Sequence, residues 1–206
     1  MKLYRMPLGM LGTNCYIVVD EQSNQCLVVD PGSDGEHVVE VLQEKNLNPL
    51  GVVLTHGHSD HIGGIQPIVD IYHCPIYVHK KDEPFLTDSR LNLSVYSGST
   101  VEAHGKVRHV KESDILSCGS LSFRVIETPG HTPGGVCYYG EGILLAGDTL
   151  FRESVGRTDF PGGSFDDLAA AVSEKLFPLP EETVVYPGHG PETTIAHEKE
   201  YNPFVR

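Results

Sequence analysis

The stretch "LTHGHSDHIGG", Leu54–Gly64, places His56, His58, Asp60 and His61 within one short segment. Folding alone does not require so many ligand-type side chains together, and imidazole and carboxylate groups bind zinc, iron or manganese well. The continuous apolar run "LGVVL", residues 50–54, leads into the segment, and such a run is typical of a strand buried on both faces. The segment therefore predicts a metal site at the end of a buried strand.

Three further ligand-type residues follow apolar, strand-like runs and lie beside glycine or proline. They are His131 in "TPGHTPGG", Asp148 in "LLAGDTLF" and His189 in "VVYPGHGP". Loops at strand ends often carry function because a rigid scaffold positions them. We therefore expect these three loops to meet the first segment and to complete its metal site.

The spacing of the ligands favours two ions rather than one. Positions i and i+2 of an extended chain face the same side, so His56 and His58 can hold one ion, with His131 completing the set. Asp60 and His61 come after a turn and can face a second ion together with His189. Asp148 has two carboxylate oxygens and can bridge. Two metals that share a water lower its pKa towards ~7 and supply hydroxide at neutral pH.

The composition indicates one globular domain over residues 1–206, with 28 acidic and 15 basic residues and a net charge of −13. Most of this surface would repel a polyanion, so we expect no nucleic-acid partner. The apolar N-terminal run is interrupted by proline and glycine, and no window is long enough to span a membrane, so we expect no membrane partner and a cytoplasmic location. The scattered cysteines indicate small buried residues rather than disulfides or a cysteine zinc site: Cys15, Cys26, Cys74, Cys118 and Cys137.

The hydrophobic pattern mixes strands and helices, which predicts two packed sheets with helices outside. Two N-terminal strands flank a turn. The helices are predicted over 33–46, capped by Ser33 or Asp34, over 164–177, capped by Ser164, and over 192–201. A strand and a short helix are expected over 74–85 and a loop with short elements over 89–109. The other predicted strands lie at 26–32, 50–56, 106–110, 121–130, 136–140, 142–150 and 182–190.

The motifs "THGHSDH", "TPGHTPGG", "GDTLF" and "PGHG", in that order, resemble the metallo-β-lactamase superfamily. The likeness covers nearly the whole chain and implies an α/β fold, a four-layer αββα sandwich of two mixed sheets with helices on the outer faces. It implies Asp60 and Asp148 as catalytic residues, Asp60 orienting the hydroxide. By the same resemblance, the ligand sets are His56, His58 and His131 for one metal, Asp60, His61 and His189 for the other, and Asp148 between them.

Two longer stretches, "GDTLFRESVGRTDFPGGS" and "YPGHGPETTIAHEKEYNPF", resemble the single-domain glyoxalase II-like hydroxyacylglutathione hydrolases. This implies hydrolysis of a small thioester such as S-D-lactoylglutathione with two divalent ions, Zn²⁺ first and Fe or Mn as alternatives. Arg157 is the nearest match to a family lysine and Tyr138 aligns with a family aromatic, so both are candidate substrate-binding residues. Full-length glyoxalase II holds glutathione with a C-terminal extension that this sequence lacks, so we expect a weak hold on the glutathione part.

Other readings of the same motifs remain open. Persulfide dioxygenases resemble this chain and use one iron, for which His56, His131 and Asp148 would be the ligands. A lactonase or β-lactamase would share the metal site, whereas a nuclease would need a basic surface. A binding module without catalysis would need no open pair of metals. The sequence leaves the oligomeric state open.

Overall fold

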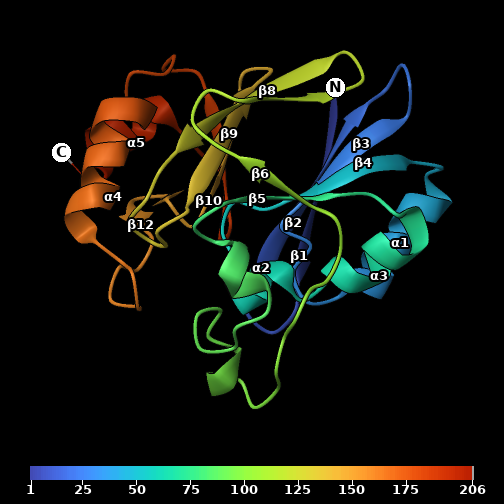
Figure 1. Ribbon diagram of the computed structural model, residues 1–206. Coiled ribbons are helices and arrows are strands. Elements are labelled where there is room, and N and C mark those ends of the chain that lie inside the picture. The colour runs from blue at the N-terminus through green and yellow to red at the C-terminus, as the bar shows by residue number, and fades with distance from the viewer. Residues whose placement is uncertain (206) are drawn as a thin grey trace.

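The computed structural model of the protein describes residues 1–205, and two six-stranded sheets form its centre (Figure 1). The first sheet has the order β1-β2-β3-β4-β5-β6: β1 (Lys2–Leu8), β2 (Thr13–Asp20), β3 (Gln25–Val29), β4 (Asn48–Val53), β5 (Ile76–His79) and β6 (Val107–Val110). The second has the order β14-β13-β10-β9-β8-β7: β7 (Ile115–Cys118), β8 (Leu121–Glu127), β9 (Val136–Gly140), β10 (Ile143–Gly147), β13 (Val184–Pro187) and β14 (Thr193–Thr194).

Both sheets are mixed. In the first, β1, β2 and β3 pair antiparallel, and β3, β4, β5 and β6 pair parallel. In the second, the antiparallel order is interrupted once, where β10 and β13 run parallel. A separate small hairpin joins β11 (Leu150–Phe151) to β12 (Ser154–Val155).

Helices cover the outer face of each sheet, which gives the expected four layers (Figure 1). Helices α1 (Gly35–Glu44) and α3 (Ile65–Tyr72) pack on the first sheet. Helices α4 (Phe165–Ala171) and α5 (Ile195–Tyr201) pack on the second, with the π-helical turn η3 (Val172–Leu176) continuing α4. The remaining short elements are α2 (Ser59–Ile62) and two 3₁₀ turns, η1 (Glu83–Leu86) and η2 (Ser94–Tyr96).

Three hydrophobic cores of the described residues lie between these layers. A strand with an unbroken apolar sequence places side chains in two of these cores, one on each face. In β2, Ile17 packs under the helices of the first sheet while Tyr16 and Val18 pack between the sheets. In β10, Leu144 faces α4 and α5 while Leu145 faces the first sheet. Side chains alternate across a strand, so a strand buried on both faces needs an unbroken apolar sequence.

The helix starts agree with the sequence in part. Ser164 caps α4, since its hydroxyl accepts a hydrogen bond from the Asp167 amide at 3.3 Å. Asp34 stands at the N-cap of α1 but makes no side-chain cap bond there. Its carboxylate accepts instead from the Gly9 amide at 2.8 Å, so it fastens the β1–β2 loop. Helix α3 was not predicted. Its Pro67 suggests a break, but proline is tolerated in the first turn of a helix.

The loops that carry ligand-type residues gather at one edge of the sandwich. His56 follows β4 of the first sheet, and His131, Asp148 and His189 follow β8, β10 and β13 of the second. Because β10 and β13 are parallel neighbours, the loops bearing Asp148 and His189 begin side by side. All five cysteines are buried and reduced. Within residues 1–205, no helix is long and apolar enough to cross a membrane.

Candidate metal centre

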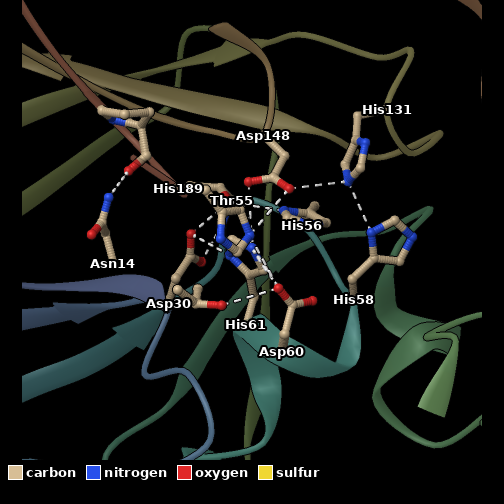
Figure 2. Close-up of polar contacts among 12 residues, drawn as sticks. Asn14, Asp30, Thr55, His56, His58, Asp60, His61, His131, Asp148 and His189 are labelled. Carbon is tan, nitrogen blue, oxygen red and sulfur yellow. Dashed lines mark hydrogen bonds and ion pairs between the residues drawn. The ribbon is translucent and has the colours of Figure 1, made fainter. Parts of the chain in front are cut away.

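The structure brings all seven ligand-type residues together at the edge between the two sheets (Figure 2). Their inward ligand atoms form three overlapping groups, and the atoms of each group lie within 4.8 Å of one another. We call His56, His58 and His131 the three-His set, and Asp60, His61 and His189 the Asp60 set. A third group joins His56 and His61 to Asp148.

The three-His set is held by hydrogen bonds on the far side of two rings. Thr55 donates its hydroxyl hydrogen to Asp30 at 2.6 Å, so the His56 Nδ1–H donates to the Thr55 oxygen at 3.1 Å and leaves Nε2 facing inward. The His131 Nδ1–H donates to the Arg157 carbonyl at 2.6 Å, which also leaves Nε2 inward. His58 Nδ1 lies 2.9 Å from His131 Nε2. A fixed tautomer of this kind is what a metal-binding imidazole needs.

The Asp60 set is held in the same manner, by one carboxylate and by neutral groups. His61 Nδ1 lies 3.0 Å from a carboxylate oxygen of Asp30, and the His189 Nδ1–H donates to the Leu11 carbonyl at 3.2 Å. Asp60 Oδ2 accepts from the Thr13 hydroxyl at 3.0 Å and lies 3.1 Å from His189 Nε2. The inward nitrogens of both rings therefore converge on the Asp60 carboxylate.

Asp148 lies between the two sets. One of its oxygens, Oδ1, lies 3.4 Å from His61 Nε2. The other, Oδ2, lies 3.6 Å from both His131 Nε2 and His189 Nε2. The neighbouring Gly188 leaves the room for this arrangement, because a Cβ there would overlap the Asp148 carboxylate and lie 2.8 Å from the His61 ring. The two Asp148 oxygens therefore face both ligand sets.

The donor set fits divalent cations. Among residues 1–205, the buried side-chain atoms without a hydrogen-bond partner include His56 Nε2, His61 Nε2 and Asp148 Oδ1, all of which point into the centre. Buried polar atoms are normally paired, so a group of unpaired ones needs an explanation. Divalent ions held by these nitrogens and oxygens would satisfy them.

The two sets differ in their protonation. Burial and the neighbouring histidines lower the pKa of His56, and burial, His131 and His61 lower that of His58 to about 3, so both rings stay neutral with a lone pair to offer. Burial would also lower the pKa of His61, but Asp60, Asp148 and Asp30 raise it well above its usual value. These three carboxylates therefore favour the protonated form of the His61 ring.

The carboxylates stay ionised in this environment. Burial would raise the pKa of Asp60 and of Asp148, but His61 is the largest opposing influence and holds both below the usual value. Both side chains can therefore act as anionic ligands at neutral pH.

Two surface cavities reach the Asp60 set. One of about 410 Å³ lies between the β1–β2 loop and α2 and is lined by Met10, Leu11 and Asp60 among others. The other, of about 350 Å³, is lined by Phe151, Arg152 and His189. Because the three-His ligands are nearly fully buried, the Asp60 set is the part of the cluster that is open to solvent.

The two candidate substrate residues have different surroundings. Tyr138 is only 1% exposed, and its hydroxyl donates to the Leu54 carbonyl at 2.7 Å. It belongs to the core between the sheets, so its expected contact with substrate was wrong. Arg157 lies beside the centre, but its guanidinium forms a two-pronged pair with Asp159 at 2.8 and 2.9 Å and stacks over the Phe160 ring. Its contact with substrate stays a prediction.

Sequence reasoning missed the residues behind the ligands, namely Thr13, Asp30, Thr55 and Asp82. Asp30 ends the apolar run "CLVVD" and has φ of +48°. An aspartate directly after a buried strand was the available signal. Thr13 begins β2 and Asp82 stands in a polar turn, and nothing in the sequence distinguishes either residue.

The comparisons with known proteins agree with this geometry. The model of the metallo-β-lactamase superfamily matches residues 8–189. A probable metallo-hydrolase of Bacillus subtilis, YqgX, is 38% identical over 100% of this chain and 98% of its own. The hydroxyacylglutathione hydrolase GloC of Haemophilus influenzae is 32% identical over 100% of this chain and 98% of its own.

Two solved structures have the same fold over almost their whole length. The BLEG-1 B3 metallo-β-lactamase superposes with a TM-score of 0.94 at 39% identity and covers 99% of both chains. TTHA1623, solved in a di-iron-bound form, has a TM-score of 0.88 at 36% identity, covering 98% of this chain and 99% of its own. By fold, by sequence and by its cluster of histidines and aspartates, this chain belongs to the metallo-β-lactamase superfamily and is a metallo-hydrolase that binds divalent metal.

Proposed function

We propose that the protein hydrolyses small thioesters of the hydroxyacylglutathione type at two divalent metal ions. The observation that carries the proposal is the convergence of both ligand sets on Asp148, beside two cavities open to solvent. The likeness to GloC of Haemophilus influenzae and the "GDTLFRESVGRTDFPGGS" stretch support the choice of substrate. Zinc is our first choice of metal, with iron as the alternative that the di-iron relative supports.

The residues of the chain divide the work of such a reaction. Bound divalent ions lower the pKa of a shared water and polarise a substrate carbonyl. The Thr13 hydroxyl donates to Asp60 Oδ2, which would leave Asp60 Oδ1 to accept a hydrogen from the attacking water and to orient it. A thiolate leaves without needing a proton, so no separate general acid is required of the chain. Asp148 fixes the separation of the two ligand sets, on which the alignment of water and carbonyl depends.

The thiol part of the substrate has a candidate partner in the cavity beside His189. Arg152 forms the turn of the β11–β12 hairpin and lines that cavity, and its guanidinium has no ion-pair partner among residues 1–205. Arg157 is already paired with Asp159. An unpaired guanidinium offers a substrate carboxylate a two-pronged contact without first losing another one. We therefore add Arg152 to Arg157 as a candidate for holding a carboxylate of the thiol.

Steady-state kinetics on S-D-lactoylglutathione test the proposal, with oxygen uptake on glutathione persulfide measured beside them and metal content by elemental analysis. We expect thioester cleavage, no oxygen uptake and two metals per chain. Oxygen consumption without thioester cleavage, together with one iron per chain, would assign the protein to the persulfide dioxygenases instead.

A second candidate activity is the hydrolysis of β-lactams, which the close superposition on BLEG-1 favours. The same ligand sets can serve an attack on a lactam carbonyl, but a lactam nitrogen needs a proton to leave and a thiolate does not. A chromogenic cephalosporin in the same kinetic series separates the two activities. We expect kcat/KM for the thioester to exceed that for the cephalosporin, and the reverse order would make the lactam the better assignment.

A further inference from the structure

Asp82 is a fully buried carboxylate that the proposed reaction does not use. It lies in the turn between β5 and η1. Its Oδ2 accepts from the Gly57 amide at 3.0 Å and from the Thr132 hydroxyl at 2.7 Å, and its Oδ1 accepts from the Gly134 amide at 2.7 Å. All three partners are neutral donors. Burying a carboxylate that is held only by neutral hydrogen-bond donors costs free energy. Its presence at this position therefore calls for a structural or functional reason.

The three donors belong to the two loops that supply the three-His set. Gly57 stands between His56 and His58, and Thr132 directly follows His131. One loop comes from the first sheet and the other from the second. A single carboxylate therefore fastens the two halves of this ligand set to each other, without touching any of the three imidazoles itself.

The packing around Asp82 leaves the two ligand-bearing loops little freedom to move relative to each other. A Cβ on Gly57 would overlap Phe85 and come within 3.2 Å of the Asp82 carbonyl oxygen. A Cβ on Gly134 would lie 2.5 Å from Asp82 Oδ1. Because both glycines lack a side chain, the 82–85 segment fits between the two loops. The centroid of the Phe85 ring lies 5.9 Å from that of the His58 ring.

We propose that Asp82 is a positioning residue that sets the metal affinity of the three-His set. It does so by holding the His58 and His131 loops in their metal-binding arrangement before an ion binds. The proposal rests on the metal role of these histidines in the proposed function, but not on the identity of the substrate. Residues that orient metal ligands typically change metal affinity 10- to 100-fold when they are replaced, because the ligands must then be organised at the moment of binding.

The test is cobalt binding to metal-free protein with Asp82→Asn. The substitution keeps the shape but presents an NH₂ group where an oxygen accepted hydrogen bonds. We expect the cobalt Kd of one of the two sites to rise about tenfold or more, and one metal to be lost on dialysis. The second site, which contains Asp60, should keep its Kd.

Asp20→Asn is the matched control. Asp20 is 4% exposed and accepts from the hydroxyls of Ser23 and Ser120 at 2.6 and 3.0 Å, so it is also a buried acceptor of several donors. It ends β2, whereas Thr13 at the other end of that strand faces the metal centre, a separation of roughly 23 Å for an extended strand. This variant should lose thermal stability and keep both cobalt affinities.

Equal losses of Tm in the two variants with unchanged cobalt binding would reduce Asp82 to a structural role and overturn the proposal. Should Asp82→Asn fail to fold, Thr132→Val removes one of the three donors and keeps the side-chain shape. A weakened first cobalt site in Thr132→Val, restored in Thr132→Ser, would support the proposal, and an unchanged site would refute it. None of these readouts needs thioester turnover, so a wrong substrate would leave the result intact.

Discussion

The three-His set and the Asp60 set both draw ligands from the segment "HGHSDH" but differ in solvent exposure and in protonation. The three-His ligands are 2% to 6% exposed and include rings whose pKa burial lowers. In the Asp60 set, the side chains of Asp60 and His189 are 20% and 28% exposed, and the His61 pKa is raised by carboxylates. The three-His set is a buried cage in which His56 and His58 are neutral, whereas the Asp60 set is charged and more accessible to solvent. Neighbouring ligands of similar type can thus be tuned separately by the residues that lie behind them.

Asp148→Asn is expected to have the largest effect, because Asp148 is the contact common to both sets. The change removes a negative charge where two cations would meet and disturbs the alignment of the attacking water, so it acts mainly on the transition state. We expect kcat to fall on the order of 100- to 1000-fold, which corresponds to several kcal/mol, with KM changed much less. Steady-state kinetics would measure both, and an unchanged kcat would contradict the bridging position.

Asp60→Ala tests whether the sets bind separately. The three-His set keeps all of its ligands in this variant, so elemental analysis should show one metal per chain instead of two. Cobalt spectra of the remaining site should match those of the corresponding site in the unmodified protein. A variant that lost both metals would show that the sets bind as one unit, and one iron in both proteins would contradict the two-metal assignment.

Proton release separates the sets by charge. Because the His61 pKa is raised, His61 is protonated below that pKa, and a metal must displace the proton to bind. The affinity of the Asp60 set should therefore rise with pH up to the raised His61 pKa, while the His58 ring, with a pKa of about 3, has no proton to lose near neutrality. Calorimetry of zinc binding in buffers of different ionisation enthalpy counts the protons. Asp60→Ala should release fewer, and equal release would contradict the distinction.

The smallest expected effects concern the two candidate substrate-binding arginines, Arg152 and Arg157. Arg152→Ala should raise KM for lactoylglutathione by about tenfold, the usual worth of a charge-assisted hydrogen bond, with little change in kcat, because the contact is remote from the carbonyl. Arg157→Ala should raise KM less, since its guanidinium is shared with Asp159. Arg90→Ala, at a position that lines neither cavity at the centre, serves as the control. A larger effect from Arg157 would reverse the order of the two candidates.

The sequence predicted the layers and the position of the ligands better than the contacts behind them. Unbroken apolar runs such as that before His56 predict strands buried on both faces, because two cores demand them. His131, Asp148 and His189 were found because each follows such a run beside glycine or proline. Asp82 and Thr13 could not be found, since their partners are distant in the sequence and only the packed fold brings them together. Tyr138 was misassigned because a strand residue facing the neighbouring sheet and one facing a substrate have the same local sequence.

The buried cysteines have a practical consequence. Burial raises the pKa of Cys118 and of Cys137 to about 11, so only about one in 10⁴ of such thiols is ionised at neutral pH, and all five cysteines lie in the interior. A coloured disulfide reagent reacts with thiolates, so the folded protein will contribute almost no background to an assay that counts the thiol released from each substrate molecule. Unfolding exposes the cysteines, and the same reagent then reports the fraction of chains that have lost their structure.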